Sequence, residues 1–340
     1  MDIKNRTSSV TFLTIILLLL ILFSAGCIEK TTDTTVLRVV IAGSLIQPFE
    51  ELEKQFEEKY PDIDVRIEGH GSIQAIRQVT DLNRPFDLIA VADEALIPAM
   101  MYRQMKPGEK NWTDSYVPFG KTEMVLAYTN KSRYADEISE YNWYEVVKRP
   151  DVRFGLSNPV LDAAGYRGLM VLALADIFYS KDDILSATCT GNFNPEIQVL
   201  KTEDRVHIKL PDVMKPSNQK VTIRDGSIFL LSLLETGGID YTFEYLSVAK
   251  GSNLSYIRLP PDINLGDNGF HSEYGRVSVD LNFQRFSSIN LTRTGAPIVY
   301  AATIPASAKY PDLAELLLME IRENSSEIVG MPEMIMDQNV

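Results

Sequence analysis

An alternation of short apolar runs and amphipathic stretches constrains the fold from residue 37 onward. Leu37–Ile41 is an apolar, β-branched run typical of a buried parallel strand, and Ala42-Gly43-Ser44 permits a tight turn. Apolar side chains then recur at helical spacing from Ile46 to Phe56. The same order repeats as a strand, a turn, a helix and a third strand over 63–67, 69–72, 73–82 and 86–92. Such alternation predicts a parallel sheet whose ligands bind beyond the carboxyl ends of its strands.

Two serines open predicted helices at this edge of the sheet. Ser44 follows Gly43, and Ser72 follows Gly71. The first N–H groups of a helix have no partner inside the helix, and the helix dipole is positive there. Their hydroxyls and neighbouring N–H groups therefore suit an anion. For Ser44, a role as a simple N-cap is the open alternative.

The first residues have the pattern of an export signal. Lys4 and Arg6 precede the apolar run Phe12–Phe23, and small residues lead to Cys27, as in the cleavage box of a lipoprotein. We expect a signal peptide over 1–26, then a lipidated Cys27 and a tether over 27–36. An uncleaved signal anchor is the alternative. Either version places the protein outside the cell, anchored to the outer face of its membrane.

The charge of the chain limits its partners. The formal net charge is −13, and loss of the leader, with Lys4, Arg6 and Asp2, removes a net +1 and leaves −14. Basic residues do not cluster, which argues against nucleic acid as a partner. Cys189 is the one cysteine besides Cys27, so no intrachain disulfide is expected. The remaining length, about 310 residues, suits two lobes.

Two apolar strands mark the crossings between these lobes. Residues 124–128 lead out of the first lobe, and residues 298–303 lead back. Between them, Asp240–Tyr245 alternates as a strand, whereas residues 180–222 show no clear period. The chain thus passes between the lobes twice.

Two further helix starts in the second lobe carry polar side chains. Asp162 precedes an apolar helix predicted over 163–179, and Ser227 precedes a helix predicted over 228–235. Free N–H groups hold a carboxylate at an N-cap, so Asp162 is either a simple cap or a site residue. With the two serines of the first lobe, four such turns predict a hinged cleft that binds a tetrahedral oxyanion without a lysine counter-charge.

Seven segments carry a more specific pattern: VIAGSLIQPFEELEKQFEEKYPDIDV, EGHGS, DLIAVADEALIPAMM, FGKTEMVLAYTNKSRYADEI, RPDVRFGLSNPVLDAAGYRGLMVL, LLETGGIDYTFEYLSVA and LPPDINLGD. Together they resemble the extracytoplasmic molybdate/tungstate-binding proteins of archaeal ABC transporters, from Leu37 to the C-terminus. The resemblance implies an α/β, two-lobed type II periplasmic-binding fold. Each lobe is expected to be a mainly parallel sheet flanked by helices, with the ligand cleft between them. Lobe one would hold residues 37–122 plus 297–340, and lobe two residues 123–296.

The same resemblance implies the function and the site. A protein of this family captures tungstate or molybdate outside the cell and delivers it to an ABC transporter permease. We expect a monomer that uses no cofactor and is not an enzyme. The implied oxyanion contacts come from both lobes: Gly43, Ser44, Gly71, Ser72, Val160, Leu161, Asp162 and Tyr245.

One position departs from the family pattern. Archaeal members add two carboxylate oxygens to the metal, one from an aspartate that matches Asp162 and one from a glutamate whose matching position here is Ser227. A serine hydroxyl donates to an oxo group more naturally than it ligates the metal. We therefore expect a four-coordinate metal, or one held by Asp162 and a weak further oxygen. Asp225 or a water would have to supply that oxygen.

Three alternatives remain open at this point. The first is another tetrahedral oxyanion, sulfate or phosphate. The second is a sensor or adhesion lipoprotein that keeps the fold. The third is a hydrolase, since His70 lies near Ser72 and two more histidines, His207 and His271, follow. Neither a G-x-S-x-G nor an H-E-x-x-H motif occurs in the sequence, which argues against the hydrolase.

Overall fold

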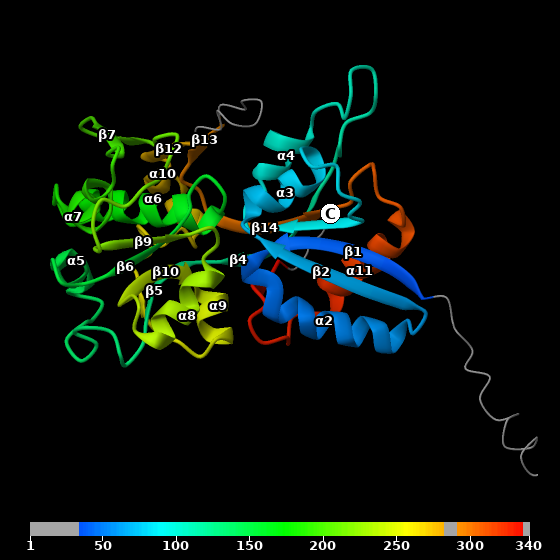
Figure 1. The fold of residues 1–340 in the computed structure, drawn as a ribbon, viewed down its shortest axis with the longest axis horizontal. Helices are drawn as coiled ribbons and strands as arrows, with labels where there is room; N and C mark the ends of the chain where they lie inside the picture. Colours follow the sequence, from blue (N-terminus) through cyan, green and yellow to red (C-terminus); the bar gives the residue numbers. More distant parts are fainter. Residues whose placement is uncertain (1–33, 282–290, 336–340) are drawn as a thin grey trace, which may run out of the picture. The chain divides into compact units, whose positions relative to one another are not determined.

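The computed structural model describes residues 34–281 and 291–335 (Figure 1). The predicted signal peptide over 1–26, the lipidation site Cys27 and most of the tether lie outside the described residues. Residues from Val36 onward form one compact unit. Within the described ranges, no helix is both long and apolar enough to cross a membrane.

Lobe one, as we use the term, consists of the elements packed on a six-stranded sheet of order β15-β4-β14-β3-β1-β2. Helices α3 and α4 lie on one face of the sheet, and α2 and α11 lie on the other (Figure 1). The strands are β1 Thr35–Ala42, β2 Ile63–His70, β3 Leu88–Val91, β4 Val117–Thr122, β14 Ile298–Thr303 and β15 Glu333–Met334. The helices are the 3₁₀ turn η1 Gly43–Leu45, α2 Ile46–Lys59, α3 Ser72–Thr80, α4 Leu96–Met101 and α11 Pro311–Asn324.

Lobe two consists of a five-stranded sheet, β11-β5-β10-β6-β9, a four-stranded sheet, β13-β12-β8-β7, and the helices packed on them. The five-stranded sheet holds β5 Met124–Tyr128, β6 Phe154–Ser157, β9 Val221–Arg224, β10 Tyr241–Tyr245 and β11 Ser255–Arg258. The four-stranded sheet holds β7 Gln198–Lys201, β8 Val206–Lys209, β12 Val277–Leu281 and β13 Leu291–Thr294. The helices are α5 Trp143–Lys148, α6 Ala163–Phe178, α7 Ile184–Thr188, η2 Thr190–Asn192, α8 Ile228–Thr236, α9 Leu246–Gly251, η3 Asn268–Phe270 and α10 His271–Tyr274.

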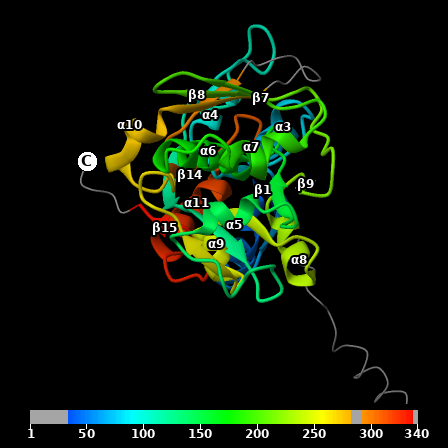
Figure 2. The ribbon, with the colours of Figure 1, turned by 90° about the vertical axis from the view of Figure 1, so that its left-hand side faces the viewer.

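Helix α6 is the centre of lobe two. It contacts β6 and β10 of one sheet and β12 of the other, and two views show it beneath the four-stranded sheet (Figure 1, Figure 2). Each residue from Ala163 to Asp176 is buried. A helix covered on all sides has no polar face, which explains why its sequence is apolar all round.

The predicted alternation at the start of the chain is confirmed, whereas the pairing of the later strands differs from expectation. Strands β1 and β3 pair in parallel, with Val40 opposite Ile89. Strands β4 and β14 carry the chain out of lobe one and back, so they must run in opposite directions, and they pair antiparallel. Antiparallel pairing also joins β5 to β10. Both lobes are therefore built on mixed rather than mainly parallel sheets.

Candidate functional site

The two predicted serines of lobe one are buried and hold fixed positions. The Ser44 hydroxyl accepts a hydrogen bond from the Tyr300 hydroxyl at 2.9 Å. The Ser72 hydroxyl accepts one from the Ala92 N–H, just beyond β3, at 3.1 Å. The N-cap residues of η1, α2 and α3 are Ala42, Leu45 and Gly71, so neither serine occupies an N-cap position and the simple capping role is not what holds either one.

The two serines are linked through lobe two by a chain of contacts. The Tyr300 ring packs against the Tyr245 ring at 5.8 Å between centroids. The Arg167 guanidinium donates to the Tyr245 hydroxyl at 2.9 Å and also to the Ala92 carbonyl. Since Ala92 donates to Ser72, one continuous network joins Ser44 to Ser72. Tyr245 and Arg167 come from lobe two, so the network spans both lobes.

Three hydroxyls of this network, those of Ser44, Ser72 and Tyr245, have the same hydrogen-bonding state. Ser44, Ser72 and Tyr245 each accept a bond from a fixed donor. A hydroxyl carries one proton besides its acceptor lone pairs, so all three protons remain available for donation. Burial raises the pKa of Tyr245, which keeps its proton in place. The three hydroxyls are thus prepared to donate to a ligand that only accepts.

Asp162 lies where the turns of the two lobes meet. Its carboxylate accepts from the Ser157 hydroxyl at 2.6 Å and from the Ser227 N–H at 2.9 Å, so it connects β6 to α8. Burial raises the pKa of Asp162, while these two donors and the Ser72 N–H oppose the rise. The carboxylate is therefore more than a cap of its own helix, because its partners come from three other elements.

The turn before α6 touches the start of α3 directly. The N–H groups of Ile73 and Gln74 both donate to the Leu161 carbonyl at 3.1 Å. A Cβ atom at Gly71 would lie only 2.4 Å from that carbonyl oxygen, so this position requires glycine. On the other side, a Cβ atom at Gly43 would lie 3.2 Å from the Ile228 side chain of α8. Both predicted glycines therefore lie at contacts between the lobes.

Two of the predicted backbone donors, the N–H groups of Val160 and Leu161, are bonded within their own turn and are not free to bind a ligand. The Val160 N–H donates to the Asn158 side chain at 3.3 Å, and the Leu161 N–H donates to the Asn158 carbonyl at 3.0 Å. These two N–H groups are thus engaged within their own turn. Asp225 is exposed, and its carboxylate accepts from the Asn158 amide at 3.4 Å. Ser227 is buried next to Asp162.

A buried ionic cluster beside the site was not predicted. Asp93 of lobe one accepts from the Tyr166 hydroxyl at 2.5 Å and pairs with Arg293 at 2.8 Å and with Arg167 at 3.6 Å. Although burial acts in the opposite direction, the two arginines hold the pKa of Asp93 below its ordinary value. An arginine inside the apolar sequence of α6 was the available signal, because a buried charge needs a partner.

Glu244 is a second functional candidate that the sequence analysis missed. It lies in β10, between β5 and β6, where all five strand residues are buried. Burial raises the pKa of Glu244 to about 8, the Tyr245 N–H and the Ser227 side chain oppose the rise, and the charge of Asp162 adds to it. Glu244 therefore shares the surroundings of the predicted site residues.

The histidines have other surroundings. The two ring nitrogens of His207 lie 2.8 Å from the Ser278 hydroxyl and 2.8 Å from the Asp280 carboxylate, in the four-stranded sheet. His70 pairs with Glu68 at 3.7 Å, and burial lowers its pKa. The hydrolase alternative, which needs a histidine to activate Ser72, gains no support from these contacts, because Ser72 is bonded to Ala92 instead.

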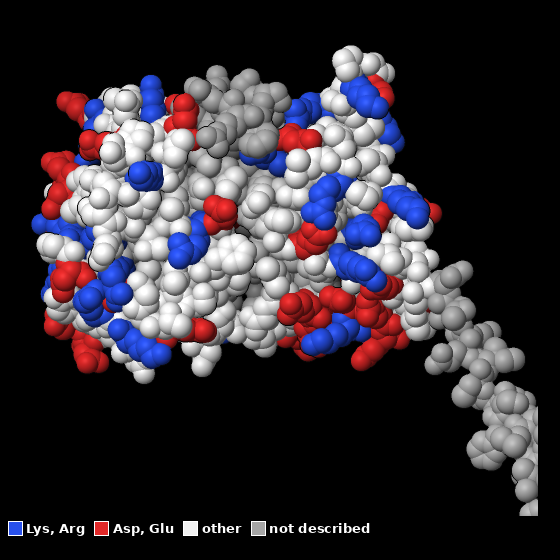
Figure 3. Space-filling view, viewed as in Figure 1, with Lys and Arg blue, Asp and Glu red and all other residues white. Residues whose placement is uncertain are grey.

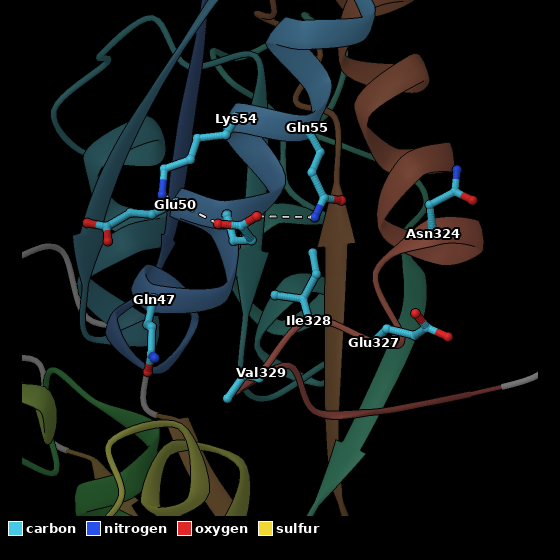
Figure 4. Close-up of a pocket in the computed structure, with 9 residues that line it drawn as sticks. Gln47, Glu50, Lys54, Gln55, Asn324, Glu327, Ile328 and Val329 are labelled. Carbon is cyan, nitrogen blue, oxygen red and sulfur yellow. Dashed lines mark hydrogen bonds and ion pairs between the residues drawn. The ribbon is translucent and has the colours of Figure 1, made fainter.

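A separate groove of about 670 Å³ lies between α2 and the segment after α11 (Figure 4). Its lining side chains are mainly carboxylates and amides, and Lys54 is paired with Glu51 at 3.4 Å. Carboxylates also gather over α2 on the face shown in Figure 3. This surface repels an anion, which favours the buried network as the candidate site.

Comparisons with known proteins identify the family of the chain. Residues 37–325 match the family described as bacterial extracellular solute-binding protein. The molybdate/tungstate-binding protein WtpA of Thermococcus kodakarensis is 39% identical over 326 residues, which cover 92% of this chain and 87% of that protein. An uncharacterised solute-binding protein of Methanococcus maripaludis is 39% identical over 298 residues, 85% of this chain and 86% of that one.

Among solved structures, the periplasmic molybdate-binding protein of Azotobacter vinelandii matches with a TM-score of 0.55 at 16% identity, covering 89% of this chain and 100% of that one. At this identity the likeness shows the fold, and the predicted type II periplasmic-binding fold is confirmed. Because the family match spans residues 37–325, the chain belongs to the extracellular solute-binding protein family.

Proposed function

We propose that the protein captures tungstate or molybdate outside the cell and delivers it to an ABC transporter permease. The observation that carries this proposal is the state of three buried hydroxyls, Ser44, Ser72 and Tyr245, each of which accepts from a fixed donor and keeps its proton for a ligand. A tetrahedral dianion offers only acceptors, so it complements this set. The WtpA relatives support the choice of ligand.

The charge of the ligand is met without direct contact from a lysine. Arg167 is 4% exposed and lies behind the Tyr245 hydroxyl, so its positive charge polarises that donor. In a buried site this charge acts through a low dielectric and is stronger than it would be in water. Of the contacts predicted from the sequence, we propose that Gly43, Ser44, Gly71, Ser72, Asp162, Ser227 and Tyr245 meet the oxyanion. The predicted Val160 and Leu161 N–H groups are left out because both donate to Asn158 within their own turn.

Asp162 gives the proposed site a preference for metal oxyanions. Its carboxylate oxygen can donate to tungsten or molybdenum, whereas sulfur in sulfate does not expand its shell in this way. Ser227 and its N–H hold the turn beside that carboxylate. We accordingly propose capture of a group 6 oxyanion rather than catalysis, and we assign the protein no cofactor.

The remaining parts of the chain fit a tethered capture protein. We propose that residues 1–26 are a signal peptide, that Cys27 carries a lipid and that residues 27–36 form a tether to the outer face of the membrane. We also propose lobe one as residues 37–122 plus 297–340 and lobe two as residues 123–296. The membership of the sheets supports these boundaries. A monomer is expected to present the closed cleft to the permease.

Calorimetry on the purified protein with tungstate, molybdate, sulfate and phosphate tests this function. We expect one tungstate or molybdate per chain, with weaker binding of sulfate and phosphate. Tight binding of sulfate or phosphate instead would assign a different oxyanion. If none of the four anions binds, the proposal is wrong, and the family membership would then describe another solute.

A further inference from the structure

We infer that Glu244 supplies a second carboxylate oxygen to the metal of the bound oxyanion, in place of the acidic side chain that Ser227 does not provide. This inference rests on the proposed function and deepens it. It assigns the missing ligand to a strand, β10, rather than to the start of a helix. It also predicts how the protein distinguishes tungstate from sulfate.

The first argument is the burial of an unsatisfied oxygen. Glu244 has 0% exposure. Its Oε1 atom accepts from the Tyr245 N–H at 2.8 Å, but Oε2 is buried and has no hydrogen-bond partner among the residues that the structure describes. Buried polar atoms are rarely left without a partner, and those that are call for a functional explanation. A ligand that takes an electron pair from Oε2 provides one.

The second argument is position. Ser227 touches both acids, since its N–H donates to Asp162 at 2.9 Å and its side chain faces Glu244. The next residue along the strand, Tyr245, contributes one of the three donor hydroxyls. Successive strand side chains point to opposite faces, so it is the shared contact with Ser227 that places Glu244 near Asp162 and next to the position that the family pattern reserves for a glutamate.

The third argument is the fit of side chains. A glutamate at position 227 would stand beside Asp162 and Glu244, and three acids in one buried space repel one another. A small serine at 227 leaves room for the longer Glu244 side chain. Asp225, the other candidate for the second oxygen, is exposed and already bonded to Asn158. The buried acid is thus better placed than the exposed one.

In chemical terms the proposed contact is a donor bond. Burial keeps a proton on Glu244 at neutral pH, so binding first releases this proton to solvent. Oε2 of the resulting carboxylate then gives an electron pair to tungsten or molybdenum, and no bond of the oxyanion has to break. Together with an oxygen of Asp162, this raises the metal from four-coordinate to six-coordinate. Sulfur cannot accept the extra oxygens, so the contact favours the metal oxyanion.

X-ray absorption on the tungstate complex of the full chain tests the inference. We expect a six-coordinate shell in the unmodified protein and one fewer carboxylate oxygen in Glu244→Gln. Calorimetry should show tungstate affinity falling by about tenfold or more in this variant. Glu235→Gln, an exposed acid on α8, is the matched control and should change neither measurement.

A double variant that moves the acid to position 227 tests whether a lost oxygen ligand in Glu244→Gln reflects misfolding. In Ser227→Glu/Glu244→Leu the acid moves to the helix start, and the six-coordinate shell should return. Two results would overturn the inference: a four-coordinate metal in the unmodified protein, or loss of an oxygen ligand in Asp225→Asn but not in Glu244→Gln. In either case tungstate still binds, so the proposed function stands. Absence of tungstate binding in the unmodified protein would overturn both.

Discussion

Lobe one presents two neutral serine hydroxyls to the proposed site, whereas lobe two presents ionisable groups besides the neutral hydroxyl of Tyr245. Ser44 and Ser72 are held by a tyrosine hydroxyl and a backbone N–H, with no charge involved. Lobe two contributes Asp162, Arg167 and Glu244, all buried. We infer from this contrast that the donors of lobe one suit any tetrahedral oxyanion, and that the ionisable groups of lobe two determine which oxyanion binds.

The largest expected effect comes from the charge in lobe two. Arg167→Met removes the donor to Tyr245 and one of the two arginines that pair with Asp93. Breaking a buried pair leaves an uncompensated charge, so stability should fall by about 3–5 kcal/mol in chemical denaturation. Arg258→Met is the control, because its exposed pair with Glu123, 3.3 Å apart, should contribute about 1 kcal/mol or less. Equal losses in both variants would contradict a special role for lobe two.

Removing the serine hydroxyls of lobe one should lower affinity as well as stability, because the Tyr300 hydroxyl and the Ala92 N–H also lose their acceptor. Ser44→Ala and Ser72→Ala each delete one hydrogen bond to a charged ligand, worth about 1.5–3 kcal/mol of binding free energy. Calorimetry with tungstate measures this loss, and Ser272→Ala, at an exposed serine of α10, serves as the control. If the serines were simple caps, stability would fall by about 1 kcal/mol and affinity would stay constant.

The contact between the turn at Gly71 and the turn before α6 can be disrupted by adding one methyl group. Gly71→Ala places a Cβ atom 2.4 Å from the Leu161 carbonyl oxygen, so the two turns must separate. We expect the free energy of unfolding, measured by chemical denaturation, to fall by about 1–3 kcal/mol, the usual range for overpacking, and tungstate affinity in calorimetry to fall as well. Gly43→Ala meets only a side-chain carbon of Ile228 at 3.2 Å, and its effect should be smaller. The reverse order would show that the two lobes do not approach at Gly71.

The smallest effect, taken over one pH unit, is a dependence of stability on pH that Glu244 of lobe two imposes. The pKa of Glu244 is 4.5 as a free side chain and about 8 in the folded protein. Between these values the folded state keeps a proton that the unfolded chain loses, so stability falls as pH rises, by at most about 1.4 kcal/mol between about pH 6.5 and 7.5. Denaturation curves in Glu244→Gln should lose this slope, and those of Glu58→Gln, an exposed acid on α2, should keep it. A slope that survives in Glu244→Gln would assign the proton to another group.

Local patterns predicted the first part of lobe one well. The strand, turn and helix order from β1 to β3 follows from residue spacing and short turns, which act over a few residues. The glycines and serines of those turns were identified for the same reason. Asp162 and Ser227 were identified because each stands at the start of a helix, where free N–H groups gather.

The residues that the sequence analysis missed depend on distant neighbours. Glu244 looks like the polar half of an alternating strand, but β10 is covered on both sides because it lies between β5 and β6. Tyr300 reaches Ser44 across 256 positions of sequence. The strands and helices over 184–209 also lacked a clear period, since short elements give few repeats to read. Such contacts depend on how the strands are ordered in the sheet, and a local sequence pattern does not give that order.

The two crossings determine how the cleft can move. A single residue, Glu123, separates β4 of lobe one from β5 of lobe two, and the second connection runs from β13 to β14 through Pro297, whose φ is fixed by its ring. Covalent connection therefore confines any rotation between the lobes to the torsion angles of a few peptide units. The lifetime of a captured anion then depends on the stiffness of these units as well as on its contacts, so a change at Glu123 should alter the release rate more than the equilibrium affinity.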